Sequence, residues 1–282
     1  MTDKWLPLWW GLFWGICALS MAHRRGLFRC FRASSLPAIR GVEVLKGFAW
    51  CAFMELLFIP SLATLFFVLS GEGANHVFHL GWRERGWLNL LTIIGGGVGA
   101  LYVYGGLGEK RRRELWRQTV EPWYHHIAIG VACWFVIYPL VLAFGQAISL
   151  VMQYVFHHPS VEQVAVQQLR KTMADRWLFI ATSLFVVTVV PLMEEFLFRG
   201  LLQSWLKRTL SHAPVAVGIT SVVFALFHYS SSQGLTNIEL LCSLFFLSCM
   251  LGFVYERQRS LWASVGLHGF FNFTSLLMLS VG

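Results

Sequence analysis

Charged residues are scarce in this sequence. Asp, Glu, Lys and Arg make up 13% of its 282 residues, whereas soluble domains carry roughly a quarter. Hydrophobic residues make up 56%, the mean hydropathy is +0.60, and apolar runs of about 20 residues recur along the chain. This composition excludes an ordinary soluble domain. It predicts an all-α, polytopic integral membrane protein, located in the cell membrane if the source is bacterial.

Cysteine pairs and signal-peptide features are also missing. The six cysteines include no C-x-x-C pattern, so neither a disulfide framework nor a zinc knuckle is predicted. The first apolar run lacks a preceding basic region, because most of the nearby positive charge follows it, and we expect a retained first span. The net charge of +8 is explained by basic residues in short loops between apolar segments. We therefore expect the lipid bilayer, and no nucleic acid, as a partner.

Eight apolar segments are predicted to cross the membrane as helices. They cover residues 5–22, 47–69, 87–106, 127–152, 177–206, 213–233, 238–255 and 260–281. Most Lys and Arg residues, including "KRRR" at 110–113, follow the odd-numbered segments, which predicts that those loops are cytoplasmic. We expect residues 1–160 to form four helices with basic cytoplasmic loops, and residues 177–281 to form a second, site-bearing group of four. Gly95 and Gly99 predict close helix packing, and residues 160–176 predict an interfacial helix.

Three charged residues interrupt the fifth apolar segment. In "PLMEEFLFRG", Glu195 and Arg199 are four residues apart and therefore share one face of a helix, with the acid before the base. They can neutralise each other as a structural pair. Glu194 lies about 100° around the helix axis and is not the natural partner of Arg199. Because an unpaired charge is costly inside a membrane, Glu194 is a candidate functional residue.

Two later segments carry paired polar residues at helical spacing. Phe224 and His228 lie one turn apart in the sixth segment, and His268 and Asn272 lie one turn apart in the eighth. A single intramembrane His is more often a packing residue, but together with Glu194 these groups predict one buried polar cavity. There, Glu194 and His228 could deprotonate a water. His268 and Asn272 could stabilise the oxyanion formed when that water attacks an amide carbonyl.

These motifs together resemble a known family. The patterns E-E-x-x-x-R, F-x-x-x-H and H-x-x-x-N, in this order on separate helices, are similar to those of the CPBP intramembrane endopeptidases, which include type II CAAX prenyl endopeptidases and bacteriocin-processing and immunity proteins. The matching residues are Glu194, Glu195, Arg199, Phe224, His228, His268 and Asn272. The resemblance covers residues 177–281. It implies a glutamate-type protease with catalytic Glu194, His228, His268 and Asn272, supported by Glu195, Arg199 and Phe224.

The resemblance also implies a membrane-anchored peptide or protein substrate, and we expect the site to open to the cytoplasmic side. No cofactor is favoured. A metal-dependent version, in which Glu194, His228 and His268 hold a divalent ion such as zinc with one open position, is the alternative. The sequence does not identify the substrate or show whether it is prenylated.

Other classes of membrane protein are the competing hypotheses. The sequence lacks H-E-x-x-H, G-x-G-D and G-x-S-x-G motifs, which argues against zinc site-2, aspartyl and serine intramembrane proteases. A proton-linked transporter could use buried Glu and His residues, and Glu55, expected to be buried in the second span, would support it. The third hypothesis is a non-catalytic immunity or adaptor protein whose polar core serves packing.

Overall fold

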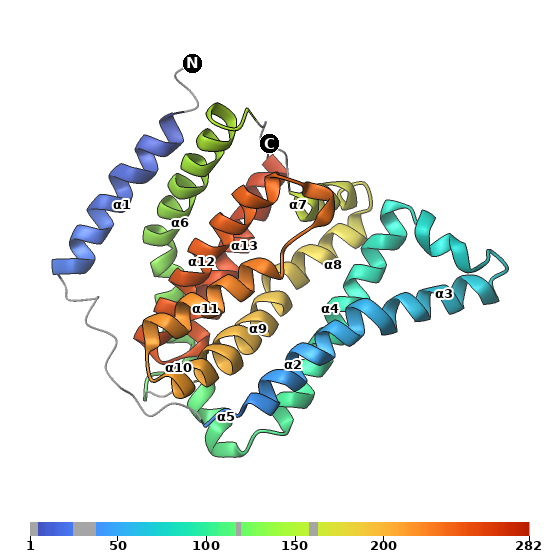
Figure 1. The fold of residues 1–282 in the computed structure, drawn as a ribbon, viewed down its shortest axis with the longest axis horizontal. Helices are drawn as coiled ribbons and strands as arrows, with labels where there is room; N and C mark the ends of the chain where they lie inside the picture. The colour runs from blue at the N-terminus through green and yellow to red at the C-terminus, as the bar shows by residue number, and fades with distance from the viewer. Residues whose placement is uncertain (1–4, 25–37, 117–119, 158–162, 282) are drawn as a thin grey trace.

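The fold is helical throughout the described chain. The computed structural model describes residues 5–24, 38–116, 120–157 and 163–281, and every regular element in these ranges is a helix (Figure 1). Most of the predicted basic loop at 24–40, including Cys30, and the start of the predicted interfacial helix lie outside the described residues. The prediction of an all-α fold is confirmed.

Six helical stretches are long and apolar enough to cross a membrane. They are Gly41–Leu69, Trp82–Gly105, Trp123–Tyr154, Arg176–Leu210, Thr236–Gln258 and Leu261–Val281. The other two predicted spans are helical but shorter in their apolar part, Leu8–Met21 and Ala213–Leu226. Ala213–Leu226 has 14 residues and reaches only about 21 Å at 1.5 Å per residue, less than the roughly 30 Å of a bilayer core. The six long spans indicate a multi-pass membrane protein.

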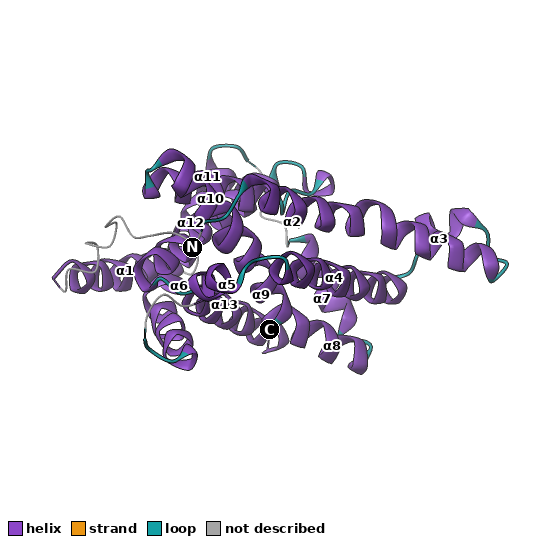
Figure 2. Ribbon diagram, turned by 90° about the horizontal axis from the view of Figure 1, so that it is seen from below, coloured by secondary structure: helices purple, strands orange, loops and turns teal. Residues whose placement is uncertain are grey.

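The first half of the chain forms the two outer parts of the molecule. Helix α1 (Leu6–Arg24) lies alongside α6 (Trp123–Tyr154) at one end, and α3 projects at the other (Figures 1 and 2). The remaining elements of this half are α2 (Gly41–Phe53), the π-helical η2 (Met54–Phe58), α3 (Ile59–Leu69), the 3-10 turn η3 (Ala74–His79), α4 (Trp82–Gly105) and α5 (Glu109–Trp116).

Glycines let α2 and α4 approach closely. The Trp50 ring occupies the space where a side chain on Gly99 would lie, and Trp50 Nε1 donates to the Gly95 carbonyl at 2.9 Å. The predicted packing role of the GxxxG pattern is therefore confirmed.

The second half contains the elements that position the site. It begins with the short helix α7 (Val164–Thr172), which lies within the stretch predicted as interfacial. A long, irregular helix follows, made of α8 (Arg176–Val187), α9 (Val189–Glu195), the π-helical η4 (Phe196–Gln203) and α10 (Ser204–Leu210). The chain continues with α11 (Ala213–Leu226), the 3-10 turn η5 (Ser231–Gln233), α12 (Thr236–Gln258) and α13 (Leu261–Val281).

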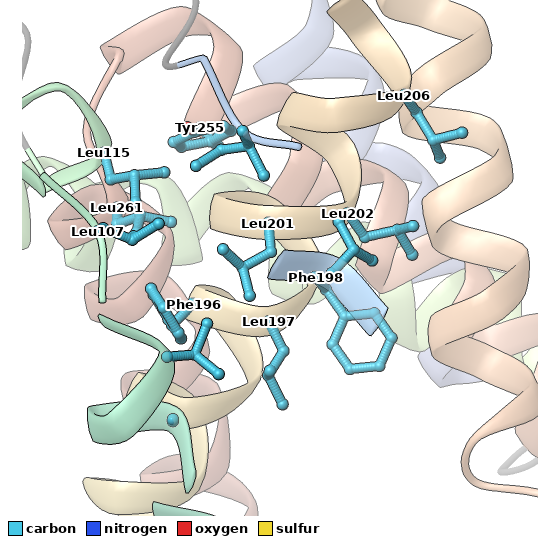
Figure 3. Close-up of a cluster of buried hydrophobic side chains, with 14 of the residues drawn as sticks. Leu107, Leu115, Phe196, Leu197, Phe198, Leu201, Leu202, Leu206, Tyr255 and Leu261 are labelled. Carbon is cyan, nitrogen blue, oxygen red and sulfur yellow. The ribbon is translucent and has the colours of Figure 1, made fainter. Parts of the chain in front are cut away.

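The main hydrophobic core surrounds η4. Phe196, Leu197, Phe198, Leu201 and Leu202 all belong to a buried cluster that also includes residues of α5, α12 and α13 (Figure 3). The outer surface is apolar as well, with large exposed side chains along α2, α3 and α4. An apolar exterior of this extent fits contact with lipid.

Candidate active site

A break in the long helix prepares the position of the glutamates. Thr188 leaves helical geometry (φ −116°, ψ −64°) between α8 and α9. Pro191 lies just after the break and has no N–H to donate to Val187, which weakens the helix at this point. The Asn272 amide Nδ2 of α13 donates to the Val186 carbonyl, in the last turn before the break, at 2.9 Å. The helix then resumes and carries Glu194 and Glu195 in the turn before η4.

Glu195 and Arg199 form a fully buried ion pair. Arg199 Nη1 donates to Glu195 Oε1 at 2.9 Å, and both side chains are 0% exposed. Arg199 Nη2 also donates to the Ser248 hydroxyl at 2.8 Å and to the Ser248 carbonyl at 3.1 Å. The centroid of the Phe224 ring lies 4.8 Å from the guanidinium carbon, a cation–π contact. The predicted pairing of Glu195 with Arg199 is confirmed, and Phe224 supports it.

His268 is oriented by the same buried carboxylate. Its Nδ1 lies 2.9 Å from Glu195 Oε1. Because a carboxylate paired with Arg199 only accepts hydrogen bonds, Nδ1 carries the proton in this contact, and Nε2 points away from it. The sequence did not predict this contact. Glu195 and His268 are 73 residues apart, and spacing within a single helix carries no information about such a pair.

Glu194 faces two imidazoles. Its Oε1 lies 4.0 Å from His228 Nε2, and its Oε2 lies 3.7 Å from His268 Nε2. These distances exceed those of direct hydrogen bonds and leave room for a bridging group. The Glu194 side chain is 18% exposed and that of His228 is 34% exposed, so the three groups meet at a place that is reached from outside the protein core.

His228 lies just beyond α11, and not within it as predicted. The helix ends at Leu226, and His228 N donates to the Ala225 carbonyl in the following turn. The apolar run ends here, and Asn237 holds the next loop by accepting from Ser230 N and donating to the Ser230 carbonyl. His228 Nδ1 lies 2.9 Å from the Phe224 carbonyl. That oxygen can only accept, so His228 also directs its Nε2 towards Glu194.

Asn272 has a different contact from the one predicted. It lies one turn after His268 on α13, but its amide donates to Val186, and within the described ranges no direct contact joins it to Glu194 or His228. One amide N–H remains beyond that bond. In the described part of the chain, no group of three or more His, Cys, Asp or Glu side chains is arranged to hold a metal ion. Glu194, His228 and His268 thus face one another without forming a preorganised set of ligands.

Glu55 does not occupy the buried position expected for a transporter residue. It lies on an exposed face of η2, in the span Gly41–Leu69. The extra residue of a π-helical turn shifts side-chain directions relative to an α-helix, so the burial of Glu55 could not be inferred from α-helical spacing.

Part of the second half of the chain matches a known family model. Residues 176–274 match the family model described as type II CAAX prenyl endopeptidase Rce1-like. The matched region runs from the start of α8 into α13 and contains every residue of the three motifs. No curated protein and no solved structure matches the chain.

Proposed function

Because residues 176–274 form an Rce1-like type II CAAX prenyl endopeptidase domain of the CPBP family, we propose that the protein is an intramembrane endopeptidase. Membership of this family suggests a CAAX-type protease, with a protein as substrate. The finer proposal is hydrolysis of a peptide bond in a membrane-anchored peptide or protein. It rests on one observation, the convergence of Glu194, His228 and His268 from three separate parts of the chain.

Glu194 and His228 have the geometry to activate a water. A water between Glu194 Oε1 and His228 Nε2, which are 4.0 Å apart, can give one proton to this pair as its oxygen attacks the carbonyl carbon. The new C–O bond yields a tetrahedral oxyanion. When the C–N bond breaks, the same proton passes to the leaving amine. No covalent enzyme intermediate is needed.

His268 and Asn272 are the proposed oxyanion donors. The imidazolium form of His268 has an N–H on each ring nitrogen, one bonded to Glu195 and the other directed at the space beside Glu194. Asn272 would contribute the amide N–H that its bond to Val186 leaves free. One such donor is typically worth about 3 kcal/mol of barrier. The uneven Lys and Arg distribution supports access from the cytoplasmic side.

The proposal is tested by comparing Glu194→Gln with Glu195→Gln. The purified protein is supplied with a library of membrane-anchored peptides, and cleavage is followed by mass spectrometry. We expect Glu194→Gln to lower the cleavage rate by roughly 100-fold or more, because a general base is lost, with an unchanged unfolding temperature. Glu195→Gln should lower the unfolding temperature, because Arg199 then lacks its buried partner.

Glu55→Gln is the matched control, since it neutralises an exposed carboxylate of another span, and we expect it to retain cleavage. Equal rates for wild type and Glu194→Gln would eliminate Glu194 as the base. Absence of cleavage by the wild type would favour the non-catalytic adaptor. We expect a strong chelator to leave the rate unchanged, and a loss of activity would support the metal-dependent version.

A further inference from the structure

A large groove lies on the side of α9 where Met193 and Phe196 emerge. Its volume is about 1090 Å³, at the upper end of the roughly 300–1,000 Å³ of small-ligand sites. Apolar side chains of α4 and α9, including Ile94, Val98 and Leu192, form most of its lining. Glu194 and Glu195 are not among the lining residues, although they lie between Met193 and Phe196 in the sequence. The groove is therefore distinct from the proposed active site.

One end of the groove carries an arginine without an acidic partner. In the "KRRR" sequence of α5, Lys110 pairs with Glu114, Arg111 with Glu43, and Arg113 with Glu109. Within the ranges that the structure describes, no carboxylate pairs with Arg112. Its guanidinium lies over the Tyr104 ring, 5.6 Å from the centroid, and both residues line the groove.

The contact between Arg112 and Tyr104 leaves the charge available. A guanidinium that stacks on a ring keeps the N–H groups at its edge free for an anion. Glu109 also lines the groove, but it is engaged by Arg113. The basic end of the groove thus has one positive charge that no described acidic group neutralises.

Three tryptophans mark the same end as a membrane interface. Trp116, Trp123 and Trp262 all line the groove. The Trp262 ring lies 4.6 Å from that of Trp116 and 5.7 Å from that of Trp123, measured between centroids. Tryptophan concentrates at the level of lipid headgroups. The groove therefore has a cation and an aromatic cluster at one end and an apolar floor beyond them. This order matches the charged headgroup and apolar chains of a lipid in one leaflet.

The length of the groove agrees with that match. Its α4 wall runs from Ile94 to Tyr104, which corresponds to about 15 Å of helix at 1.5 Å per residue. A bilayer core is about 30 Å thick, so this wall spans about one leaflet. The residues that line the groove come mainly from α4, α5 and α9, with Trp262 of α13 beside them.

We propose that this groove binds an anionic phospholipid, with the phosphate on Arg112 and the acyl chains along α4 and α9. A phosphate can accept two hydrogen bonds from one guanidinium, and an anionic headgroup is favoured over a zwitterionic one because no described carboxylate neutralises Arg112. The apolar floor and its length identify the chains. The bound lipid contacts Met193 and Phe196, which adjoin Glu194 and Glu195, and it holds that turn in place. Lipid binding does not depend on the proposed proteolysis.

The test measures lipid selectivity with two matched charge variants. The full-length protein is placed in phosphatidylcholine bilayers that contain roughly 10–20 mol% phosphatidylglycerol. It is then extracted with a mild detergent, and the lipids that stay bound are counted by native mass spectrometry. We expect the wild type to retain phosphatidylglycerol about fivefold to tenfold above its share in the bilayer. One charge-assisted contact changes a binding constant by about that factor. Arg112→Gln should lose this preference, and Arg112→Lys should keep part of it.

Lys110→Gln is the control, because it removes the same charge from a highly exposed residue of the same helix that does not line the groove. Val98→Trp, at a half-exposed position, should fill the apolar floor and reduce retention of both lipids. Equal losses for Arg112→Gln and Lys110→Gln would overturn the proposal in favour of a diffuse basic surface. No preference in the wild type, or full retention by Val98→Trp, would also overturn it. If Arg112→Gln unfolds, Arg112→Lys and Val98→Trp still decide the outcome.

Discussion

Two groups of charged residues in this chain contrast in their burial, one between the long irregular helix and α12 and the other on α5. In the second half, Glu195, Arg199, Lys207 and Glu256 are buried and each is paired within the protein. On α5, Arg113 pairs with Glu109 and Lys110 with Glu114 at the helix surface, while Arg111 pairs with the buried Glu43 of α2. Exposed pairs contribute little to stability, whereas a buried pair leaves a costly isolated charge when one partner is lost. The contrast separates charges that orient the candidate site from charges that lie at the surface of α5.

The buried charges of the second half form a seam between two helices. Glu195 is followed at four-residue intervals by Arg199, Gln203 and Lys207, and these last three contact α12. Arg199 contacts Ser248, Gln203 donates to the Gly252 carbonyl, and Gln203 and Lys207 both donate to Glu256. A Cβ on Gly252 would lie 2.8 Å from Gln203 Oε1 and 2.9 Å from Val217 Cγ1, so the two helices approach closely there. The seam fixes Glu195, which in turn orients His268.

Removing one partner of a buried pair should give the largest loss of stability. Arg199→Met leaves the carboxylate of Glu195 without its cation in a fully buried place. We expect the free energy of unfolding in detergent to fall by about 3–5 kcal/mol. Arg113→Met breaks an exposed pair, with Arg113 78% exposed, and should change it by about 1 kcal/mol or less. Similar losses for the two variants would show that burial does not distinguish the two ion pairs.

Disrupting the close packing of α6 against α13 should give the next largest loss of stability. A Cβ on Gly130 of α6 would overlap the backbone carbonyl of Ala263 on α13, and one on Gly266 would lie 2.7 Å from the Ile127 carbonyl. Since backbone atoms cannot rotate away, we expect Gly130→Ala to lower stability by about 1–3 kcal/mol.

Gly218→Ala is the control for this contact. Gly218 lies on α11, and a Cβ added to it would have nothing within 4 Å. There, alanine should be neutral or stabilise the helix by up to about 1 kcal/mol. Thermal unfolding of both variants in one detergent measures the difference. Equal stability of the two would contradict the close approach of α6 and α13.

Interactions within one helix were predictable, and those between helices were not. The Glu195–Arg199 pair followed from i, i+4 spacing. The contact of Glu195 with His268, and that of Asn272 with Val186, depend on how α13 packs against α8 and α9. No local pattern specifies that packing. The order of three polar motifs was nevertheless enough to predict the family whose model matches residues 176–274.

The apolar segments were predictable as helices, but the extent of each helix was not. All eight apolar segments are helical, but α11 ends at Leu226 and leaves His228 in a turn. Hydropathy predicted a helix that continues beyond Leu226. It does not report the hydrogen bonds by which Asn237 stabilises the following loop. Glu55 was expected inside the protein from its apolar neighbours, but it lies in a π-helical turn and is exposed. Composition reports neither the distant contact of Asn237 nor the π-helical turn.

The smallest change in stability is expected at the start of α8, where Asp175 links this helix to α4. Asp175 caps this helix by accepting from Trp177 N and Leu178 N, and it pairs with Arg83 of α4 at 2.6 Å. The Leu178 N–H holds the pKa of Asp175 below its usual value, and the charge of Arg83 adds to this against an opposing effect of desolvation. A lowered pKa in the folded state means that the stabilisation is present at neutral pH. It is lost as the pH falls through that value.

Asp175→Asn isolates this charge, since asparagine is an equally good helix cap. We expect the variant to unfold slightly below wild type at pH 7, by less than Gly130→Ala. The difference should shrink as the pH falls below about 4, where free Asp side chains begin to protonate. Thermal unfolding of both proteins between about pH 3 and 7 measures it. A difference that persists or grows in acid would mean that Asp175 acts through its shape alone, and that the link between α4 and α8 does not depend on charge.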